Sequence, residues 1–199
     1  MARNKDDKEQ VKEQQATYDT YAEMPDDGNR YEVLNGTLEM MSGPNLVHQV
    51  VSGKLHFTLT QSCNSEYLIL VAPLDVILSR TNVLQPDLVL IHRSRSDIVT
   101  FRGIEGAPDL VVEIISPGSR NRDKVRKMKI YAQHQVPEYW VIDPVSRTLE
   151  QYLLSGEAYI IGRLFEGDET VISERLPCIS YSIAELFSDP GIQKFMMLN

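Results

Sequence analysis

The sequence is poor in cysteine and histidine, and it has no long apolar run. Two cysteines, Cys63 and Cys178, lie far apart among 199 residues, which predicts free thiols in a reducing compartment. The four histidines show no zinc-ligand spacing with them. No apolar run approaches the roughly 20 residues of a membrane span, and the polar first 15 residues do not resemble a secretory signal. We therefore expect a cytoplasmic protein with no membrane partner.

The chain also lacks a net positive charge. Its formal charge of −8 argues against a protein that coats nucleic acid through a broad basic face. The charge is nevertheless uneven, because the ten residues from 120 to 129 carry six basic side chains and one acidic side chain. That window has a charge of +5 and leaves −13 for the rest of the chain. One basic helix face on an acidic body is the predicted distribution.

The composition is ordinary for a soluble domain, with 42% hydrophobic and 24% charged residues. Residues 1–15 are almost entirely polar and are expected to form a disordered tail. No repeat or linker divides the remainder, so residues 16–199 are expected to form a single domain.

Two hairpins are expected to frame strands and helices. Asn35-Gly36 can take the positive φ of a tight turn and predicts a hairpin over 30–42, and Ser155-Gly156 predicts another over 149–164. Helices are expected at 17–24, 44–62, 119–134 (with Ser119 as its N-cap), 182–187 and 191–197. Strands are expected at 67–72, 74–78, 86–92, 109–115 and 139–142. This order predicts an α/β fold with a mixed sheet.

Two carboxylates lie where burial is costly. Glu113 interrupts the apolar run from Leu110 to Ile115, and Asp87 directly precedes the apolar run 88–91. A carboxylate buried in a strand costs several kcal/mol unless it is paired or binds a metal. Glu113 could therefore be a satisfied structural acid, a general base or a metal ligand. Two such acids on neighbouring strands suit a hard divalent cation such as Mg²⁺.

Lys127 is the third candidate. Asp123, Lys127 and Tyr131 are spaced by four residues, so they share one face of the expected helix. An ordinary Asp–Lys pair on a solvated face has the same spacing. The helix follows the strand of Glu113 closely, however, so a long lysine side chain could reach back to that carboxylate.

Taken together, these residues resemble a known family. The matching blocks are Pro86-Asp87, the runs 112–117 and 136–144, Arg122-Asp123 with Lys127 and Tyr131, the hairpin residues 31–36 and the helix start 44–48. Over about residues 16–190 the sequence is similar to the bacterial putative restriction endonuclease family of the PD-(D/E)xK nuclease superfamily. The resemblance implies a restriction endonuclease-like fold, a mixed β-sheet flanked by helices with added β-hairpins.

The resemblance also implies hydrolysis of DNA phosphodiester bonds with Mg²⁺, for which Mn²⁺ could substitute. Asp87 and Glu113 would hold the metal with the carbonyl of Ile114. Glu32 resembles a further catalytic acid. A surface acid near Arg30 would fit the same sequence. The superfamily motif has a lysine two residues after the second acid, where this chain has isoleucine. The resemblance implies that the lysine is relocated to the following helix, where Lys127 would supply it.

The expected partner is DNA, bound weakly through its phosphates. The residues expected to contact the backbone are Arg120, Arg122, Lys124 and Arg126. Cutting both strands would favour a homodimer. Two other functions stay open: a catalytically silent nucleic-acid-binding or regulatory module on the same fold, motivated by the vacated lysine position, and a structural homodimer in which Glu113 is paired internally.

Overall fold

The computed structural model describes residues 15–116 and 122–190, without the side chains of 122 and 123. It has two main sheets of six strands each, and the one with the longer strands, called the larger sheet, has the order β12-β11-β10-β9-β6-β3. Their bounds are β3 (Tyr67–Val71), β6 (Leu88–His92), β9 (Leu110–Ile114), β10 (Glu138–Asp143), β11 (Thr148–Ser155) and β12 (Ala158–Phe165). Strand β9 pairs parallel with β10 and antiparallel with β6, so the sheet is mixed. The predicted α/β fold class is confirmed.

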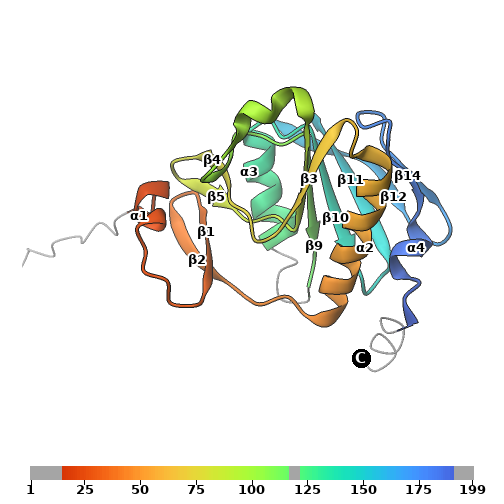
Figure 1. Cartoon of the computed structure of the whole chain (residues 1–199), viewed down its shortest axis with the longest axis horizontal. Helices are drawn as coiled ribbons and strands as arrows, with labels where there is room; N and C mark the ends of the chain where they lie inside the picture. The colour runs from red at the N-terminus through yellow and green to blue at the C-terminus, as the bar shows by residue number, and fades with distance from the viewer. Residues whose placement is uncertain (1–14, 117–121, 191–199) are drawn as a thin grey trace, which may run out of the picture.

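Helices cover both faces of this sheet (Figure 1). Helix α2 (Leu46–Cys63) packs on one face, where it buries Val51, Leu55, Leu59 and Cys63 at a spacing of four residues. Val112 and Ile114 of β9 join that core, whereas Val111 and Ile115 join the core on the opposite face with α3 (Met128–Gln133). Because strand side chains alternate, Glu113 belongs to the α3 face.

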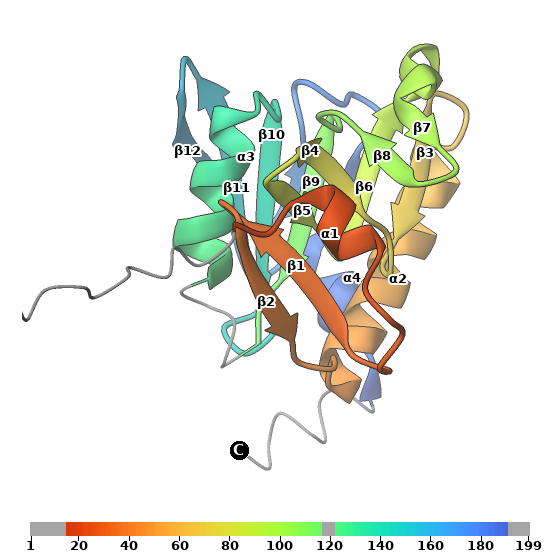
Figure 2. The same ribbon diagram turned by 90° about the vertical axis from the view of Figure 1, so that its left-hand side faces the viewer.

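A second six-stranded sheet lies beside the first and is built largely from the N-terminal part of the chain (Figure 2). Its strands are β2 (Thr37–Met41), β1 (Arg30–Leu34), β5 (Asn82–Leu84), β4 (Val76–Ser79), β8 (Gly103–Glu105) and β7 (Val99–Thr100), in that order. The β1–β2 turn has positive φ at Asn35 and Gly36, as the sequence predicted. The chain crosses from this sheet to the larger one through residues 85–87, between β5 and β6.

The remaining elements are short. They are α1 (Tyr18–Ala22), a 3₁₀ helix at Arg93–Ile98, β13 (Thr170–Ile172), β14 (Ser180–Ser182) and α4 (Ile183–Phe187). The predicted helix at 119–134 needs correction, because Arg122–Lys127 is π-helical and only Met128–Gln133 is α-helical. The expected cap at Ser119, the tail up to residue 14 and the helix at 191–197 lie outside the described residues. Strands β5, β7 and β8 are too short, at two or three residues, to give a periodic signal.

The prediction of two free thiols is wrong. Cys63 and Cys178 form a disulfide that spans 115 residues of sequence. Cys63 ends the buried face of α2, and Cys178 packs against the same core just before β14. Their separation along the chain concealed a proximity that arises only when the C-terminal segment folds across the helix.

None of the helices in the described residues is both long enough and apolar enough to span a membrane.

Candidate active site

Glu113 lies in the middle of the larger sheet and is 3% exposed. Its Oε1 accepts a hydrogen bond from the Tyr131 hydroxyl at 2.9 Å and from the Lys127 amine at 3.0 Å. Burial, followed by the charges of Glu113 and Glu32, raises the pKa of Tyr131 well above its usual value. Tyr131 therefore stays a neutral donor, and Glu113 is held as an acceptor on the α3 face.

Lys127 is the last residue of the π-helical segment and is 1% exposed. Its Nζ lies 2.7 Å from Oε1 of Glu32 and 3.0 Å from Oε1 of Glu113. Lys127 and Tyr131 thus share one helix face, as their spacing predicted, and that face looks toward Glu113. The alternative of an ordinary pair on a solvated face does not hold for this lysine.

Glu32 comes from β1 of the second sheet and is fully buried. Its Oε1 accepts the backbone N–H of Gln85 at 2.8 Å in addition to the contact with Lys127. Its other oxygen, Oε2, is buried without a hydrogen-bond partner among the described residues. Glu32 is therefore not a surface acid, although its place two residues after Arg30 is compatible with one.

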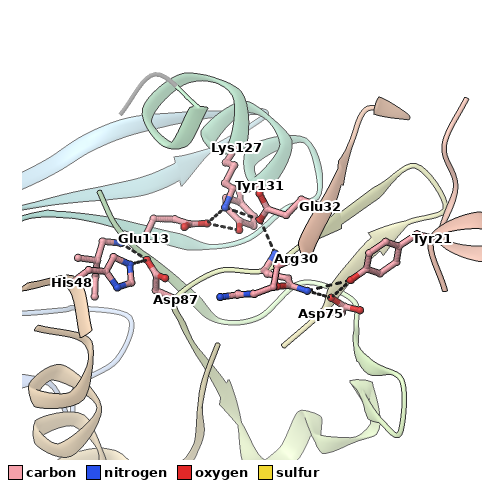
Figure 3. Close-up of polar contacts among 11 residues, drawn as sticks. Tyr21, Arg30, Glu32, His48, Asp75, Asp87, Glu113, Lys127 and Tyr131 are labelled. Atoms are coloured by element: carbon pink, nitrogen blue, oxygen red, sulfur yellow. Dashed lines mark hydrogen bonds and ion pairs between the residues drawn. The ribbon is translucent and has the colours of Figure 1, made fainter. Parts of the chain in front are cut away.

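Asp87 lies one residue before β6, directly across from the end of β9. Its Oδ2 accepts the backbone N–H of Ile114 at 2.7 Å and lies 3.0 Å from Nε2 of His48. Both contacts fall on the same oxygen, so Oδ1 takes part in neither. The two acids predicted on neighbouring strands thus lie at the same end of β6 and β9, where Figure 3 shows Asp87 between His48 and Glu113.

His48, Asp87, Glu113 and Lys127 line a cleft of about 400 Å³. The ionisable residues of its described lining are Arg30, His48, His56, Asp87, Glu113 and Lys127. Residues from both sheets and from α2 therefore converge on one hollow (Figure 3).

The donor set of this cleft suits a hard cation with few protein ligands. The described residues contain no group of three His, Cys, Asp or Glu side chains close enough to enclose a metal ion. Mg²⁺ needs no such cage, because it is usually bound by one or two carboxylates, with water and substrate phosphate completing the octahedron. Asp87 and Glu113 provide two carboxylates, and Ile114 also lines the cleft.

The predicted DNA-contacting residues have other partners or lie outside the described part of the chain. Nζ of Lys124 lies 2.6 Å from Glu150 Oε1, and Arg126 forms an ion pair of 2.5 Å with Glu39. Arg120 and the side chain of Arg122 are not among the described residues. Lys124 and Arg126 therefore do not line the cleft, and each pairs with an acid on a strand, β11 and β2 respectively.

Sequence reasoning missed three residues of the cleft region. His48 lies in the first turn of α2, where a histidine is more often a capping or packing residue, yet it contacts Asp87. Arg30 and Gln85 gave no signal, although Gln85 donates to Glu32 and accepts from Nε of Arg30 at 2.9 Å. A period of two was the available clue for Arg30, because it places Arg30 and Glu32 on the same face of β1.

Comparison with known proteins identifies the family. The model of a family described as "Putative restriction endonuclease" (Uma2) matches residues 18–184. A solved structure, that of a putative nuclease belonging to DUF820 from Anabaena variabilis ATCC 29413, is 20% identical. The match covers 86% of this chain and 97% of that chain with a TM-score of 0.72, which establishes a shared fold. A search of curated proteins gave no match. The chain belongs to the Uma2 family of putative restriction endonucleases.

Proposed function

We propose that the protein is a metal-dependent endonuclease that hydrolyses DNA phosphodiester bonds. The observation that carries the proposal is a buried lysine bonded to the carboxylate of a central strand, with a second acid at the edge of the same cleft. The family and the solved relative are both described as putative nucleases. Position 115, where the superfamily motif has its lysine, is an isoleucine in this chain. Lys127 is therefore the lysine that we assign to that role.

Asp87 and Glu113 would hold Mg²⁺, or Mn²⁺ in its place, with the carbonyl of Ile114 as a third oxygen donor. When bound, the ion would supply positive charge at the scissile phosphate. The contacts of Asp87 support this assignment, because His48 and the Ile114 N–H both hold Oδ2 and thereby fix the direction of Oδ1. Outer contacts of this kind orient metal ligands in proteins.

Lys127 would orient the attacking water and offset negative charge as the phosphorus gains a fifth oxygen. In the overall reaction, water forms the new P–O bond, the bond from phosphorus to the 3′ oxygen breaks, and that oxygen takes up a proton. The products would carry 5′-phosphate and 3′-hydroxyl ends. Glu32 is assigned the role of holding the Lys127 amine beside Glu113, which makes it a positioning residue rather than a group that touches the substrate.

DNA would be bound mainly through its phosphates, with the 120–129 segment as the basic contact region. Such binding is weak and largely independent of sequence. Cleavage of both strands would be carried out by a homodimer. Activity on DNA would place the protein in the cytoplasm. Free thiols no longer support that location, because Cys63 and Cys178 form a disulfide and disulfides are rare in reducing compartments.

A catalytically silent nucleic-acid-binding module is the second candidate. The observation that favours it is the near-complete burial of Lys127 between two carboxylates. A lysine fixed in this way could serve only to stabilise the two acids. The two candidates differ in whether phosphodiester bonds are broken.

A plasmid nicking assay with Mg²⁺, Mn²⁺ or EDTA tests the proposal. The wild type should nick supercoiled DNA with either metal and not with EDTA, whereas Asp87→Asn and Glu113→Gln should be inactive. Glu174→Gln is the matched control, because Glu174 is an exposed acid outside the cleft. Mn²⁺ binding measured by calorimetry gives a second readout, which both cleft variants should weaken. A wild type that binds DNA but never cuts it with either metal would favour the silent module.

A further inference from the structure

We propose that Arg30 is the phosphate-binding residue of the cleft, and that its guanidinium contacts a phosphodiester oxygen of the bound nucleic acid. This inference rests on the proposed function, because it assigns the group that would hold the substrate anion at that site. Arg30 is half-buried and lines the cleft together with Asp87, Glu113 and Lys127.

The charge balance of the cleft calls for such a group. The positive charge of Lys127 is met by Glu32 and Glu113, and Asp87 adds another carboxylate. Together these four residues carry a net charge of −2, which a bound Mg²⁺ would only neutralise, so a phosphodiester anion would still need a further cationic partner. Arg30 is the other cationic side chain in the described lining of the cleft.

Arg30 is held at one end of its guanidinium group only. Its Nε donates to Oε1 of Gln85 at 2.9 Å. Among the residues that the structure describes, neither Nη nitrogen makes a hydrogen bond or an ion pair. The side of the planar group that can donate to two oxygens at once is thus left for a ligand, and arginine suits phosphate because its donors form a rigid fork.

The anchor, Gln85, is itself held by several hydrogen bonds. The Nε2 of Gln85 donates to Asp75 Oδ1 at 2.8 Å and to the Tyr21 hydroxyl at 3.1 Å. The backbone N–H of Gln85 bonds to Glu32, which also holds Lys127. Figure 3 shows Arg30 between the Lys127 cluster and Asp75. One glutamine therefore fixes Arg30 relative to the lysine, and a preorganised donor loses less freedom when it binds.

The test uses a DNA duplex and the whole protein, with Ca²⁺ present so that binding can be measured without cleavage. Each phosphate contact adds about −0.9 to the slope of log K against log salt. Arg30→Met should make that slope less negative by about 0.9 and should weaken binding by roughly 10- to 100-fold, the usual effect of losing a charge-assisted hydrogen bond. Arg80→Met is the matched control, because Arg80 is exposed and pairs with Asp19 away from the cleft.

Arg30→Lys separates the charge from the fork. It should keep the wild-type salt slope while losing part of the affinity, because an ammonium group cannot donate in a bidentate plane. If Arg30 only braced Gln85, Arg30→Met would lower the melting temperature and leave the slope unchanged, and that result would overturn the inference. If Arg30→Lys and Arg30→Met are both folded and bind DNA with the same affinity and the same salt slope, the inference is overturned as well.

The outcomes also separate this inference from the proposed nuclease activity. A wild type that never cleaves DNA, but whose binding loses one phosphate contact in Arg30→Met, would refute the nuclease proposal and support the role of Arg30. A wild type that cleaves, with Arg30→Met matching it in rate, affinity and salt slope, would support the nuclease and refute the role of Arg30.

Discussion

The Nζ of Lys127 lies 2.7 Å from Oε1 of Glu32, although the two residues come from a helix on the larger sheet and a strand of the smaller one. Both side chains are buried. Removing one member of a buried ion pair leaves the other charge without compensation and typically costs about 3–5 kcal/mol. We therefore expect Lys127→Met to lower the free energy of unfolding by that amount, as measured by urea denaturation.

The double variant Glu32→Gln/Lys127→Met is the control. It removes both charges of the pair, so its stability should recover part of the loss. Cleavage should nevertheless fall by about 100-fold or more in the double variant, because a charge partner of the transition state is missing. A Lys127→Met protein as stable as the wild type would contradict the burial of this pair, and undiminished cleavage would remove Lys127 from the chemistry.

His48 and Asp87 provide the second prediction. The Nε2 of His48 lies 3.0 Å from the Asp87 oxygen that also accepts the Ile114 N–H. His48→Ala should weaken Mn²⁺ binding by about 10- to 100-fold, as the loss of outer contacts to metal ligands usually does. Isothermal titration calorimetry measures the effect.

His56→Gln is the matched control for that experiment, because His56 lines the same cleft and makes no hydrogen bond or ion pair among the described residues. It should bind Mn²⁺ as the wild type does. Equal losses in both variants would show that the cleft as a whole, and not the contact with Asp87, was disturbed.

The stability of the protein should fall at high pH partly through Tyr131. Burial raises the pKa of Tyr131 well above the usual value of about 10 for an unfolded tyrosine. The folded state then binds the proton more tightly, so this contribution is complete below pH 10 and is lost as pH rises toward the folded pKa. The expected slope is about 1.4 kcal/mol per pH unit. Tyr131→Phe should show a shallower fall, and slopes equal to wild type would refute the assignment.

The basic segment gives a prediction about affinity. Lys124 and Arg126 bond to Glu150 and Glu39, so their charges are partly offset before any DNA arrives. If they still contact phosphates, Lys124→Ala/Arg126→Ala should reduce the salt slope by as much as about 1.8. Fluorescence anisotropy at several salt concentrations measures it. An unchanged slope would remove these two residues from the interface.

The disulfide predicts a dependence on reducing agent. Closing a loop of about 100 residues restricts the unfolded chain and stabilises a fold by roughly 2–5 kcal/mol. Cys63→Ser/Cys178→Ser should lower the melting temperature of the oxidised protein and remove its response to dithiothreitol. A titration that finds two free thiols in the untreated protein would contradict the bond.

Sequence patterns predicted the features that depend on residues close together in the sequence. The Asn35-Gly36 turn, the apolar run of β9 and the four-residue spacing of Lys127 and Tyr131 depend on near neighbours, and each was confirmed. The Cys63–Cys178 bond and the contact of His48 with Asp87 depend on tertiary packing between segments far apart in sequence. The periodicity of a sequence carries no information about contacts between such distant segments.

The cleft is complete only when strand β1 of the second sheet is docked against the larger sheet. Glu32 reaches from this strand to Lys127 above the other sheet, and Gln85 ties it to the crossing segment that ends at Asp87. A slip of β1 by one residue would turn Glu32 and Arg30 to its opposite side, since side chains alternate. Cleft assembly and docking of the first hairpin are therefore one event: a chain whose hairpin has not docked would present a misassembled pocket, and the integrity of that pocket would report on whether the two sheets have come together.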